Sequence, residues 1–366
     1  MKICYIAEAT SVPSQRWINH FAQKGHEAHL ISWVRGGQYD ASVRRYWLAR
    51  FLPQLWSVTK HLGIFTWPIQ SRQLVNKIKP DIIEGHWLTT AAVLTATSGF
   101  TPIILNAWGS GVLVYAKRFR IWRNIIKYAL KKAAIVTCNS RFMRDELIKL
   151  NTHPDKIRII YPGVKTEQFS PKHRSRELRD KLQIGDDPTV ISTRNLRPIY
   201  NVELLIKAIP SVLAQIPEAK FVLCGDGQQG NYLQSLAKSL GVSNSIRFTG
   251  SIAHSELPGY LSSSDVYVST SLSDSSSMSL HEAMSTELPV VLTDHPSNRE
   301  LIDDNETGFL VSPDDEKGLA KKILLLLKDK ELAARFGKSG RQLISKKANY
   351  DIEMQKVEKI YQELSC

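Results

Sequence analysis

The chain has 366 residues, 43% of them hydrophobic, and a formal net charge of +13. Because single hydrophobic cores rarely grow beyond ~250 residues, this length predicts two domains. The sequence contains no apolar run of the ~18 residues needed to span a membrane, and its start, MKICYIAEAT, turns polar too early for a signal peptide. We therefore expect a cytoplasmic protein, at most peripheral on the cytoplasmic face of a membrane.

The positive charge is confined to the first half of the chain. Up to Val164 there are 23 Lys and Arg against 8 Asp and Glu, net +15, and the remainder has 25 against 27, net −2. All eight tryptophans lie between Trp17 and Trp122. Segments 44–60 and 115–132 combine both features, and the second spaces Phe119, Trp122, Ile126 and Leu130 as on a helix. Two explanations fit these segments: they contact an anionic lipid surface, or they are helices whose apolar stripe faces the core and whose basic face is solvated. No motif indicates binding to nucleic acid.

Strands and helices alternate along the first half. We predict a strand at 2–8, a helix at 14–25 and a strand at 27–33, followed by a less regular basic segment. Three short apolar runs of the kind buried in parallel sheets come next, at 80–87, 101–108 and 133–140.

A Pro/Gly-punctuated linker at 153–171 interrupts the alternation, which then resumes. The second half has five predicted strands, at 189–195, 220–227, 245–250, 265–271 and 289–294, interleaved with helical patterns such as 200–216. A last helical segment covers 350–366. Two successive doubly wound α/β domains follow from this order.

The stretch SDSSSMSLHEAM places Asp274 and Glu282 eight residues apart around a run of serines. It follows the predicted strand 265–271, so its loop lies at a carboxyl strand end, where ligands of open α/β sheets bind. A helix should begin near residues 276–278 and favour a phosphate group, while two carboxylates can accept hydrogen bonds from sugar hydroxyls. Alternatively, Asp274 is a helix cap and Glu282 a solvated helix residue.

This stretch and the residues after it resemble the donor-binding region of the retaining glycosyltransferases of family 4. The family pattern is an acid, seven residues, then Glu-Ala-Met, Pro-Val-Val and a G-x-L-V turn, here formed by Asp274, Glu282, residues 289–291 and 308–311. Further matches cover nearly the whole chain: GHEAHLIS (25–32), DIIEGHW (81–87), NAWGSGVL (106–113), IIYPGVKTEQFSP (159–171), STRNL (192–196), CGDG (224–227) and residues 247–271.

The resemblance implies the GT-B architecture, in which two Rossmann-like doubly wound domains face each other across a cleft. Residues 1–165 would form the acceptor-side domain and residues 166–348 the domain that binds the nucleotide sugar. Residues 349–366 would form a helix crossing back to the first domain. Family members transfer with retention of anomeric configuration and need no metal ion.

The resemblance also implies roles for individual residues. Glu282 would bind the ribose hydroxyls, Asp274 the transferred sugar and Arg194 the diphosphate, where a fixed cation opposes leaving-group charge. By itself, an arginine after a strand is as readily a surface ion pair. The other expected donor-binding residues are Arg197, Tyr200, Gly225, Asp226, Gly227, Gly250, Ser251, Ile252, Ser276, Ser277, Met278 and Ser279, with a UDP-sugar favoured over a GDP-sugar. On the acceptor side we expect Ser11, Ser14, His86, Trp108 and Gly109, although a histidine such as His86 is often only packed.

Some positions depart from the family pattern. Tyr200 stands where a lysine is usual, which leaves Arg197 as the substitute cation. Trp108 and Gly111 replace a histidine and an aspartate, and TSVPSQ (10–15) replaces a glycine-rich loop.

The run GDGQQG (225–230) matches a dinucleotide fingerprint, but the acidic residue expected ~20 positions later is missing, so we do not expect NAD. The four cysteines, Cys4, Cys138, Cys224 and Cys366, form no CxxC pair, and neither HExxH nor a DxD-type pair occurs. No disulfide, metal site or cofactor is expected.

These patterns predict a hexosyltransferase-type enzyme that moves a sugar from a nucleotide-diphosphate donor to a glycan or lipid-linked acceptor, in cell-surface polysaccharide or glycolipid synthesis. The alternative is a catalytically weak partner subunit that binds a sugar nucleotide. An epimerase of similar shape is disfavoured, because the acid-x7-Glu pattern fits transfer better.

Overall fold

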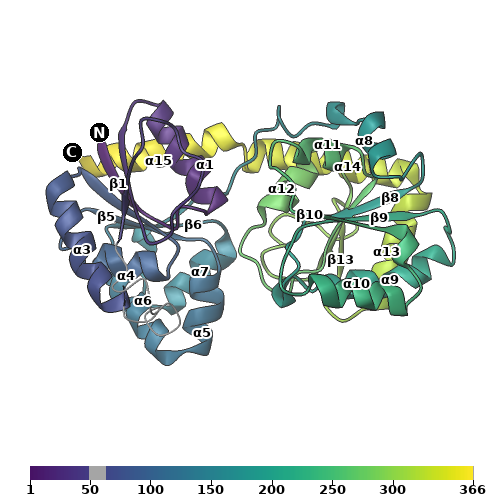
Figure 1. The fold of residues 1–366 in the computed structure, drawn as a ribbon, viewed down its shortest axis with the longest axis horizontal. Helices are drawn as coiled ribbons and strands as arrows, with labels where there is room; N and C mark the ends of the chain where they lie inside the picture. The colour runs from purple at the N-terminus through teal and green to yellow at the C-terminus, as the bar shows by residue number, and fades with distance from the viewer. Residues whose placement is uncertain (49–62, 366) are drawn as a thin grey trace. The chain divides into compact units, whose positions relative to one another are not determined.

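A computed structural model describes residues 1–48 and 63–365. The chain divides into two compact units, Met1–Tyr161 with Gln355–Cys366, and Pro162–Met354 (Figure 1). Most of the basic, tryptophan-rich segment 44–60 lies outside the described residues. Within the described part, no helix has the length and apolarity to cross a bilayer.

The first unit is built on a parallel sheet of seven strands in the order β3-β2-β1-β4-β5-β6-β7. Its strands are β1 (Lys2–Ile6), β2 (Glu27–Ser32), β3 (Arg44–Trp47), β4 (Ile82–His86), β5 (Ile103–Ala107), β6 (Ile135–Cys138) and β7 (Ile157–Ile159). Its helices are α1 (Val12–Gln23), α3 (Gly63–Ile78), α4 (Thr90–Ala96), the π-helical turn η1 (Gly111–Tyr115), α5 (Ala116–Arg118), α6 (Arg120–Lys132) and α7 (Arg141–Lys149). Strands β4 and β5 are buried along their whole length and β1 is buried from Ile3 onward, as continuous apolar runs predict.

The second unit is built on a parallel sheet of six strands in the order β10-β9-β8-β11-β12-β13. Its strands are β8 (Thr189–Ser192), β9 (Lys220–Cys224), β10 (Ile246–Gly250), β11 (Val266–Ser269), β12 (Val290–Thr293) and β13 (Phe309–Val311). Its helices are α8 (Arg176–Lys181), α9 (Val202–Leu213), α10 (Gly230–Ser239), α11 (Leu257–Ser262), α12 (Met278–Ser285), α13 (Glu316–Lys328) and α14 (Lys330–Lys347). Helices α9 and α10 lie on one side of the sheet and α11 and α12 on the other (Figure 1).

The predicted pair of parallel, doubly wound α/β domains is confirmed. In each sheet the strand order reverses once, between β1 and β4 in the first unit and between β8 and β11 in the second. Residues that follow these strands lie at the topological switch point, the place where open α/β sheets bind ligands.

Three features of the first unit differ from the sequence-based predictions. Strand β3 forms in the basic segment, where no strand was predicted. The segment 115–132 is broken at Phe119, whose extended backbone (φ −126°, ψ 115°) separates α5 from α6. Ile126 and Leu130 are buried, but Phe119 is exposed, so the predicted four-residue stripe was wrong at its start. In addition, β7 forms inside the predicted linker 153–171.

Helix α15 (Tyr350–Ser365) begins in the second unit and ends in the first. In the first unit, the hydroxyl of Tyr361 is hydrogen-bonded to Trp17 Nε1 at 3.1 Å and lies 3.3 Å from Tyr5 Oη. Tyr361 is fully buried, so the core of the first unit includes residues from far along the chain.

Candidate functional site

The switch point of the second sheet collects charged and hydroxyl side chains. Arg194 lies in the loop after β8, and Asp274 in the loop between β11 and α12. Helix α12 begins at Met278 and is capped by Ser277, whose Oγ accepts a hydrogen bond from the backbone N–H of Leu280. The predicted helix start at 276–278 is confirmed.

Arg194 is the centre of this cluster. Its Nη1 donates to the hydroxyls of Ser277 at 2.6 Å and Ser279 at 2.9 Å. Its Nη2 donates to Asp274 Oδ2 at 2.8 Å. Loops from two strand ends are thereby joined to the first turn of α12 by one guanidinium group.

The Arg194 guanidinium is held in a buried, charge-compensated position. Only 9% of the side chain is exposed, and its carbon lies 4.2 Å from the centre of the Tyr200 ring, close enough for a cation–π interaction. Burial alone would lower the pKa of Arg194, but the interactions with Asp274, Tyr267 and Tyr200 together outweigh it, and the net pKa is raised. Nε is buried and has no hydrogen-bond partner among the described residues, and such orphaned donors are rare in proteins.

Tyr267 lies beneath this cluster on β11. Its hydroxyl donates to Ser279 Oγ at 3.0 Å, and burial raises its pKa, so the phenol keeps its proton. The charges of both Arg194 and Glu282 act on this phenol.

Glu282 lies in the second turn of α12 and is only 4% exposed. Its Oε1 is 2.8 Å from His254 Nε2. The alternative interpretation of this stretch was therefore wrong on both points, because Glu282 is not solvated and the cap of α12 is Ser277 rather than Asp274.

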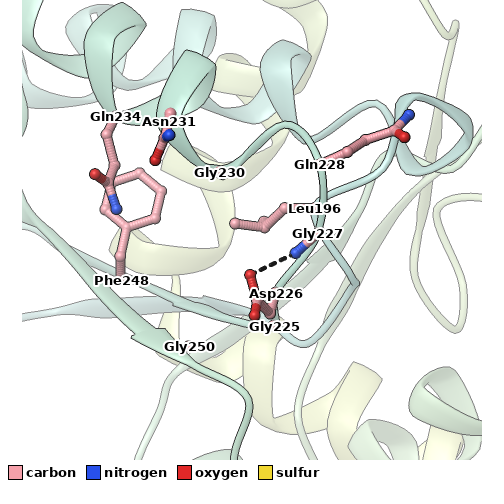
Figure 2. A pocket seen from close by; sticks show the side chains of 10 residues that line it. All are labelled: Leu196, Gly225, Asp226, Gly227, Gln228, Gly230, Asn231, Gln234, Phe248 and Gly250. Carbon is pink, nitrogen blue, oxygen red and sulfur yellow. Dashed lines mark hydrogen bonds between the residues drawn. The ribbon is translucent and has the colours of Figure 1, made fainter.

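A pocket of about 340 Å³ lies beside the turn between β9 and α10. Figure 2 shows it with its ten lining residues: Leu196, Gly225, Asp226, Gly227, Gln228, Gly230, Asn231, Gln234, Phe248 and Gly250. Leu196 and Phe248 give it apolar faces, and Asn231 and Gln234 contribute side-chain amides.

The glycines of this turn are required by close packing against the loop that carries Arg194. Gly225 has φ +153°, and a Cβ there would lie 2.5 Å from the carbonyl oxygen of Arg194. Gly227 has φ +158°, and its Cβ would lie 2.3 Å from the carbonyl oxygen of Leu196. A side chain at either position would separate the pocket from the Arg194 loop.

The other residues predicted to bind the nucleotide sugar differ in their burial. Ser276 is buried and its Oγ lies 3.1 Å from His281 Nε2. Arg197 and Ser251 are exposed, and Ile252 and Met278 are half-buried. Arg197 therefore does not join the Arg194 cluster, and Tyr200 joins it as a stacked ring rather than as a cation.

On the first unit, Ser11 and Ser14 serve the start of α1. Ser11 is its N-cap, and its Oγ accepts hydrogen bonds from Ser14 Oγ at 3.1 Å and from Trp87 Nε1 at 3.3 Å. Ser14 is fully buried. These hydroxyls are engaged in holding the loop after β1 to the end of β4.

His86 and Trp108 belong to an aromatic cluster. The His86 ring centre lies 4.7 Å from Trp108, 5.8 Å from Trp17 and 5.6 Å from Tyr5. His86 is fully buried, and neither ring nitrogen forms a hydrogen bond with any described residue. The structure packs this histidine, as one of its two alternatives states, but leaves its ring nitrogens without a partner among the described residues, so its role toward an acceptor stays a prediction.

The backbone after β5 explains two further positions. Gly109 has φ +138°, a conformation that favours glycine. At Gly111 a Cβ would lie 2.4 Å from the carbonyl oxygen of Leu88, so the aspartate usual in the family pattern would not fit here without a backbone shift.

Sequence reasoning missed a buried carboxylate in the first unit. Glu84, on β4, is fully buried; its Oε1 accepts a 2.6 Å hydrogen bond from Asn106 Nδ2, and its Oε2 accepts one from the Tyr361 hydroxyl. Asn106 Oδ1 in turn accepts a hydrogen bond from Thr137. Burial raises the pKa of Tyr361, and the nearby Glu84 charge raises it further, so the phenol remains a donor.

His254 and the amides of Asn231 and Gln234 were also missed. The only available signals were the position of His254 four residues after Gly250, and the amide-rich run QQGNYLQ. Across residues 1–48 and 63–365, no group of three or more His, Cys, Asp or Glu side chains is arranged to hold a metal ion.

Comparison with protein families gives two adjacent matches. Residues 2–140 match the family model "Glycosyl transferase 4-like", and residues 174–343 match the model "Glycosyl transferases group 1".

Curated relatives of the chain are also glycosyltransferases. The putative glycosyltransferase EpsD of Bacillus subtilis is 30% identical over 363 residues, which cover 92% of this chain and 89% of EpsD. The sulfoquinovosyl transferase SQD2 of Arabidopsis thaliana is 29% identical over 284 residues; the match covers 73% of this chain but only 54% of SQD2. A GDP-mannose-dependent alpha-(1-6)-phosphatidylinositol monomannoside mannosyltransferase of Mycobacterium tuberculosis is 26% identical, with 74% and 73% of the chains covered.

Solved structures resemble the whole chain. HepE of Anabaena, solved in complex with UDP, superposes with a TM-score of 0.79 at 18% identity, covering 99% of this chain and all of the other. Sucrose-phosphate synthase of Thermosynechococcus elongatus superposes with a TM-score of 0.83 at 18% identity, covering 99% and 98%. These likenesses identify the fold as GT-B, as the sequence predicted.

Proposed function

The chain belongs to the family 4 glycosyltransferases, and we propose that it moves a sugar from a nucleotide-diphosphate donor to a glycan or lipid-linked acceptor. The reaction would retain the anomeric configuration and proceed without a metal ion. The product would be a cell-surface glycolipid or polysaccharide, and the name of the mycobacterial relative, which acts on a phosphatidylinositol monomannoside, favours a lipid-linked acceptor.

The observation that carries this proposal is the buried Arg194 at the start of α12. Its Nε–H has no partner among the described residues and needs an acceptor. The first backbone N–H groups of a helix also favour an anion. A diphosphate placed there would satisfy Arg194 Nε, with the amides at the start of α12 as further donors.

This arrangement suits a leaving diphosphate. As the bond between the anomeric carbon and the phosphate oxygen breaks, its electron pair passes to that oxygen, and the fixed Arg194 charge stabilises the product. The acceptor hydroxyl then attacks the same face and gives its proton to a diphosphate oxygen. Asp274, held 2.8 Å from Arg194 Nη2, would orient the sugar hydroxyls.

The rest of the donor would extend from this point along α12 and β10. Glu282 would accept hydrogen bonds from the ribose diol. The pocket that includes Gly250 has apolar faces and side-chain amides that suit a heterocyclic base. We favour UDP over GDP, with the UDP complex of HepE as support, although the mycobacterial relative is named as GDP-mannose-dependent.

The test is a panel of UDP- and GDP-sugars, read as shifts in melting temperature and then as donor hydrolysis and transfer. We expect one donor to raise the melting temperature of the wild-type protein, and Arg194→Ala to remove most of that shift. Arg176→Ala is the matched control, because this arginine also pairs with an aspartate, Asp186, but is well exposed on α8. Equal shifts in wild type and Arg194→Ala would overturn the assignment of Arg194.

A catalytically weak partner subunit remains the second candidate, because one observation favours it. The cluster contains one guanidinium stacked on Tyr200, while Arg197 is exposed and takes no part. A single fixed cation neutralises less of the diphosphate charge than two would. Donor binding without any turnover, with or without acceptor, would favour this candidate over the enzyme.

We further propose that the surface of α5 and α6 docks on an anionic membrane. Residues 111–132 include seven basic and no acidic side chains. Ile121 is 74% exposed, and Phe119 and Tyr128 are exposed as well. Cations flanking exposed aromatic and aliphatic side chains suit a lipid interface.

Sedimentation with phosphatidylglycerol vesicles tests this surface. We expect binding that weakens as salt rises, that falls in Ile121→Asp, and that is absent with phosphatidylcholine vesicles. Exposed Ile352→Asp, on α15, is the matched control. Binding that is absent, or that salt does not change, would reject the proposal.

A further inference from the structure

The pair formed by His254 and Glu282 joins two parts of the second unit that are 28 residues apart in the chain. His254 lies in the loop after β10, and Glu282 lies on α12. The distance from Nε2 to Oε1 is 2.8 Å. The Glu282 side chain is almost fully buried, whereas the imidazole is about one-third exposed, so the histidine lies on the solvent side of the pair.

The imidazole is fixed by its packing. Its ring centre lies 5.3 Å from that of Phe169, which is itself buried. The Phe169 carbonyl accepts hydrogen bonds from Ser285 Oγ, on α12, and from Arg341, on α14. Because the aromatic surface is tied to α12, His254 is held at a set distance from the helix that carries Glu282.

The hydrogen bond has a definite direction. A carboxylate only accepts, so Nε2 carries the proton and donates to Oε1. Among the described residues, His254 is the only hydrogen-bond partner of the Glu282 carboxylate. Oε2 and one lone pair of Oε1 are therefore left to accept hydrogen bonds from a ligand.

From these contacts we infer that His254 is a positioning residue, which holds the Glu282 carboxylate in the orientation that receives the ribose diol of the donor. The inference rests on the proposed function, in which Glu282 binds that diol. A glutamate side chain without a partner would have to be ordered when the ligand binds, and ordering it in advance reduces that cost. The same loop contains Ser251 and Ile252 and follows directly on Gly250, the last residue of β10, so the pair also ties the proposed base-lining residues to the diol-binding helix.

The variants that test this inference separate hydrogen bonding from packing. His254→Phe keeps a ring against Phe169 but removes the donor, and His254→Gln keeps an N–H donor without an imidazole. We expect His254→Phe to weaken binding of UDP, or of GDP if that is the nucleotide bound, by about three- to tenfold. His254→Gln should restore most of the loss, and kcat at saturating donor should change less than KM.

Nucleotides without the diol provide the deciding measurement. The 2′,3′-dideoxy diphosphates should bind equally to wild type and His254→Phe, because the positioned carboxylate has no hydroxyl to meet. Calorimetric titration of each protein with UDP, GDP and their dideoxy analogues gives four affinities for each base: those of wild type and His254→Phe for the ribose ligand and for the dideoxy ligand. If the variant loses the same factor for ribose and dideoxy ligands, the role is general packing and the inference is overturned. Unchanged binding of UDP and GDP by His254→Phe also overturns the inference, since the hydrogen bond would then contribute nothing to affinity. Tighter binding overturns it as well, because His254 would then compete with the ligand for the carboxylate.

Glu282→Ala distinguishes failure of this inference from failure of the proposed function. If Glu282→Ala weakens nucleotide binding and His254→Phe does not, only the role of His254 is rejected. If Glu282→Ala leaves both UDP and GDP affinity unchanged, or the wild type binds neither, the diol site itself is rejected, and the inference with it.

Discussion

The two switch points have the same topology and different chemistry. At the second, between β8 and β11, a buried arginine meets an aspartate and two serines and keeps one N–H without a partner among the described residues. At the first, between β1 and β4, His86 ends β4 and is packed among aromatic rings, and the carboxylate of Glu84, two residues earlier in the strand, is satisfied by Asn106 and Tyr361. In the second unit the buried charged group keeps hydrogen-bonding capacity for a ligand. In the first unit the buried carboxylate is satisfied by the fold itself, and it is His86 whose ring nitrogens have no hydrogen-bond partner among the described residues.

The contrast shows that strand order alone does not place a ligand. Both sheets offer carboxyl strand ends at a reversal of strand order. The difference comes from side chains that reach the strand ends from elsewhere. In the first unit Tyr361 arrives from α15, whereas in the second unit the serines of α12 face Arg194 across a short loop.

The largest expected effect is at the second switch point. Arg194→Ala should lower kcat/KM for the preferred donor by about 10²- to 10³-fold, similar to removal of one preorganised donor from other active sites. Arg194→Lys should recover little, because an ammonium group cannot reproduce the planar contacts to Ser277, Ser279 and Asp274. Steady-state kinetics measures both variants. A loss of tenfold or less in kcat/KM for Arg194→Ala would contradict the view that the second switch point binds the leaving diphosphate.

At the first switch point we expect a change in stability without a change in nucleotide binding. Glu84→Gln places an amide N–H₂ opposite a hydrogen-bond donor and should cost about 1.5–3 kcal/mol of unfolding free energy. Urea denaturation followed by circular dichroism gives this value, and calorimetry should give the wild-type affinity for UDP or GDP. Weaker nucleotide binding with unchanged stability would reverse the roles assigned to the two regions.

A smaller effect is expected from the ring beneath Arg194. Tyr200→Ala removes the cation–π contact and should weaken nucleotide binding by about 0.5–2 kcal/mol, while Tyr200→Phe should be close to wild type. The difference between the two variants isolates the stacking from the hydroxyl. If both variants behave alike in calorimetry, Tyr200 does not position Arg194.

The smallest effect concerns an ion-pair cluster of the first unit. Lys117 and Lys149 each lie 2.7 Å from Glu146. Burial opposes ionisation of Glu146, but the two lysines outweigh it and the pKa of this carboxyl is lowered. Its stabilising contribution is therefore present above the unfolded pKa of about 4.3 and is lost as pH falls through the lower folded value.

Because both lysines are largely exposed, we expect at most about 1 kcal/mol from this cluster. Melting temperatures of wild type and Glu146→Gln should differ most near neutral pH and converge in acid. A gap that widens as the pH falls would contradict the assigned direction of the pKa shift.

The sequence predicted the central strands better than the edges of the sheets. Every strand with neighbours on both sides was found, because burial on both faces produces a continuous apolar run. Among the residues that the structure describes, the three strands that were missed, β3, β7 and β13, all lie at an edge. In β3 the residues Arg44 and Arg45 are exposed, so the apolar pattern that marks a buried strand is missing.

The candidate site was predictable where it depends on local order along the chain. Arg194, Asp274 and Ser277 each follow a recognisable strand or begin a helix, so their positions could be inferred. The pairs between distant segments could not: His254 with Glu282, Tyr267 with Ser279, and Glu84 with Tyr361 depend on how separate elements pack. Tyr200 was predicted near the diphosphate, but its stacking on Arg194 is visible only in three dimensions.

Helix α15 has a consequence for the order in which the molecule can be completed. The Glu84 carboxylate lies on a strand made early in synthesis, and its partner Tyr361 is made after the entire second unit. While the ribosome translates residues 162–354, the nascent first unit holds a carboxylate that lacks one of its native donors and a surface not yet covered by this helix. Its final consolidation has to wait for the segment beyond residue 354, so a truncation that removes this segment would damage the half that was translated first.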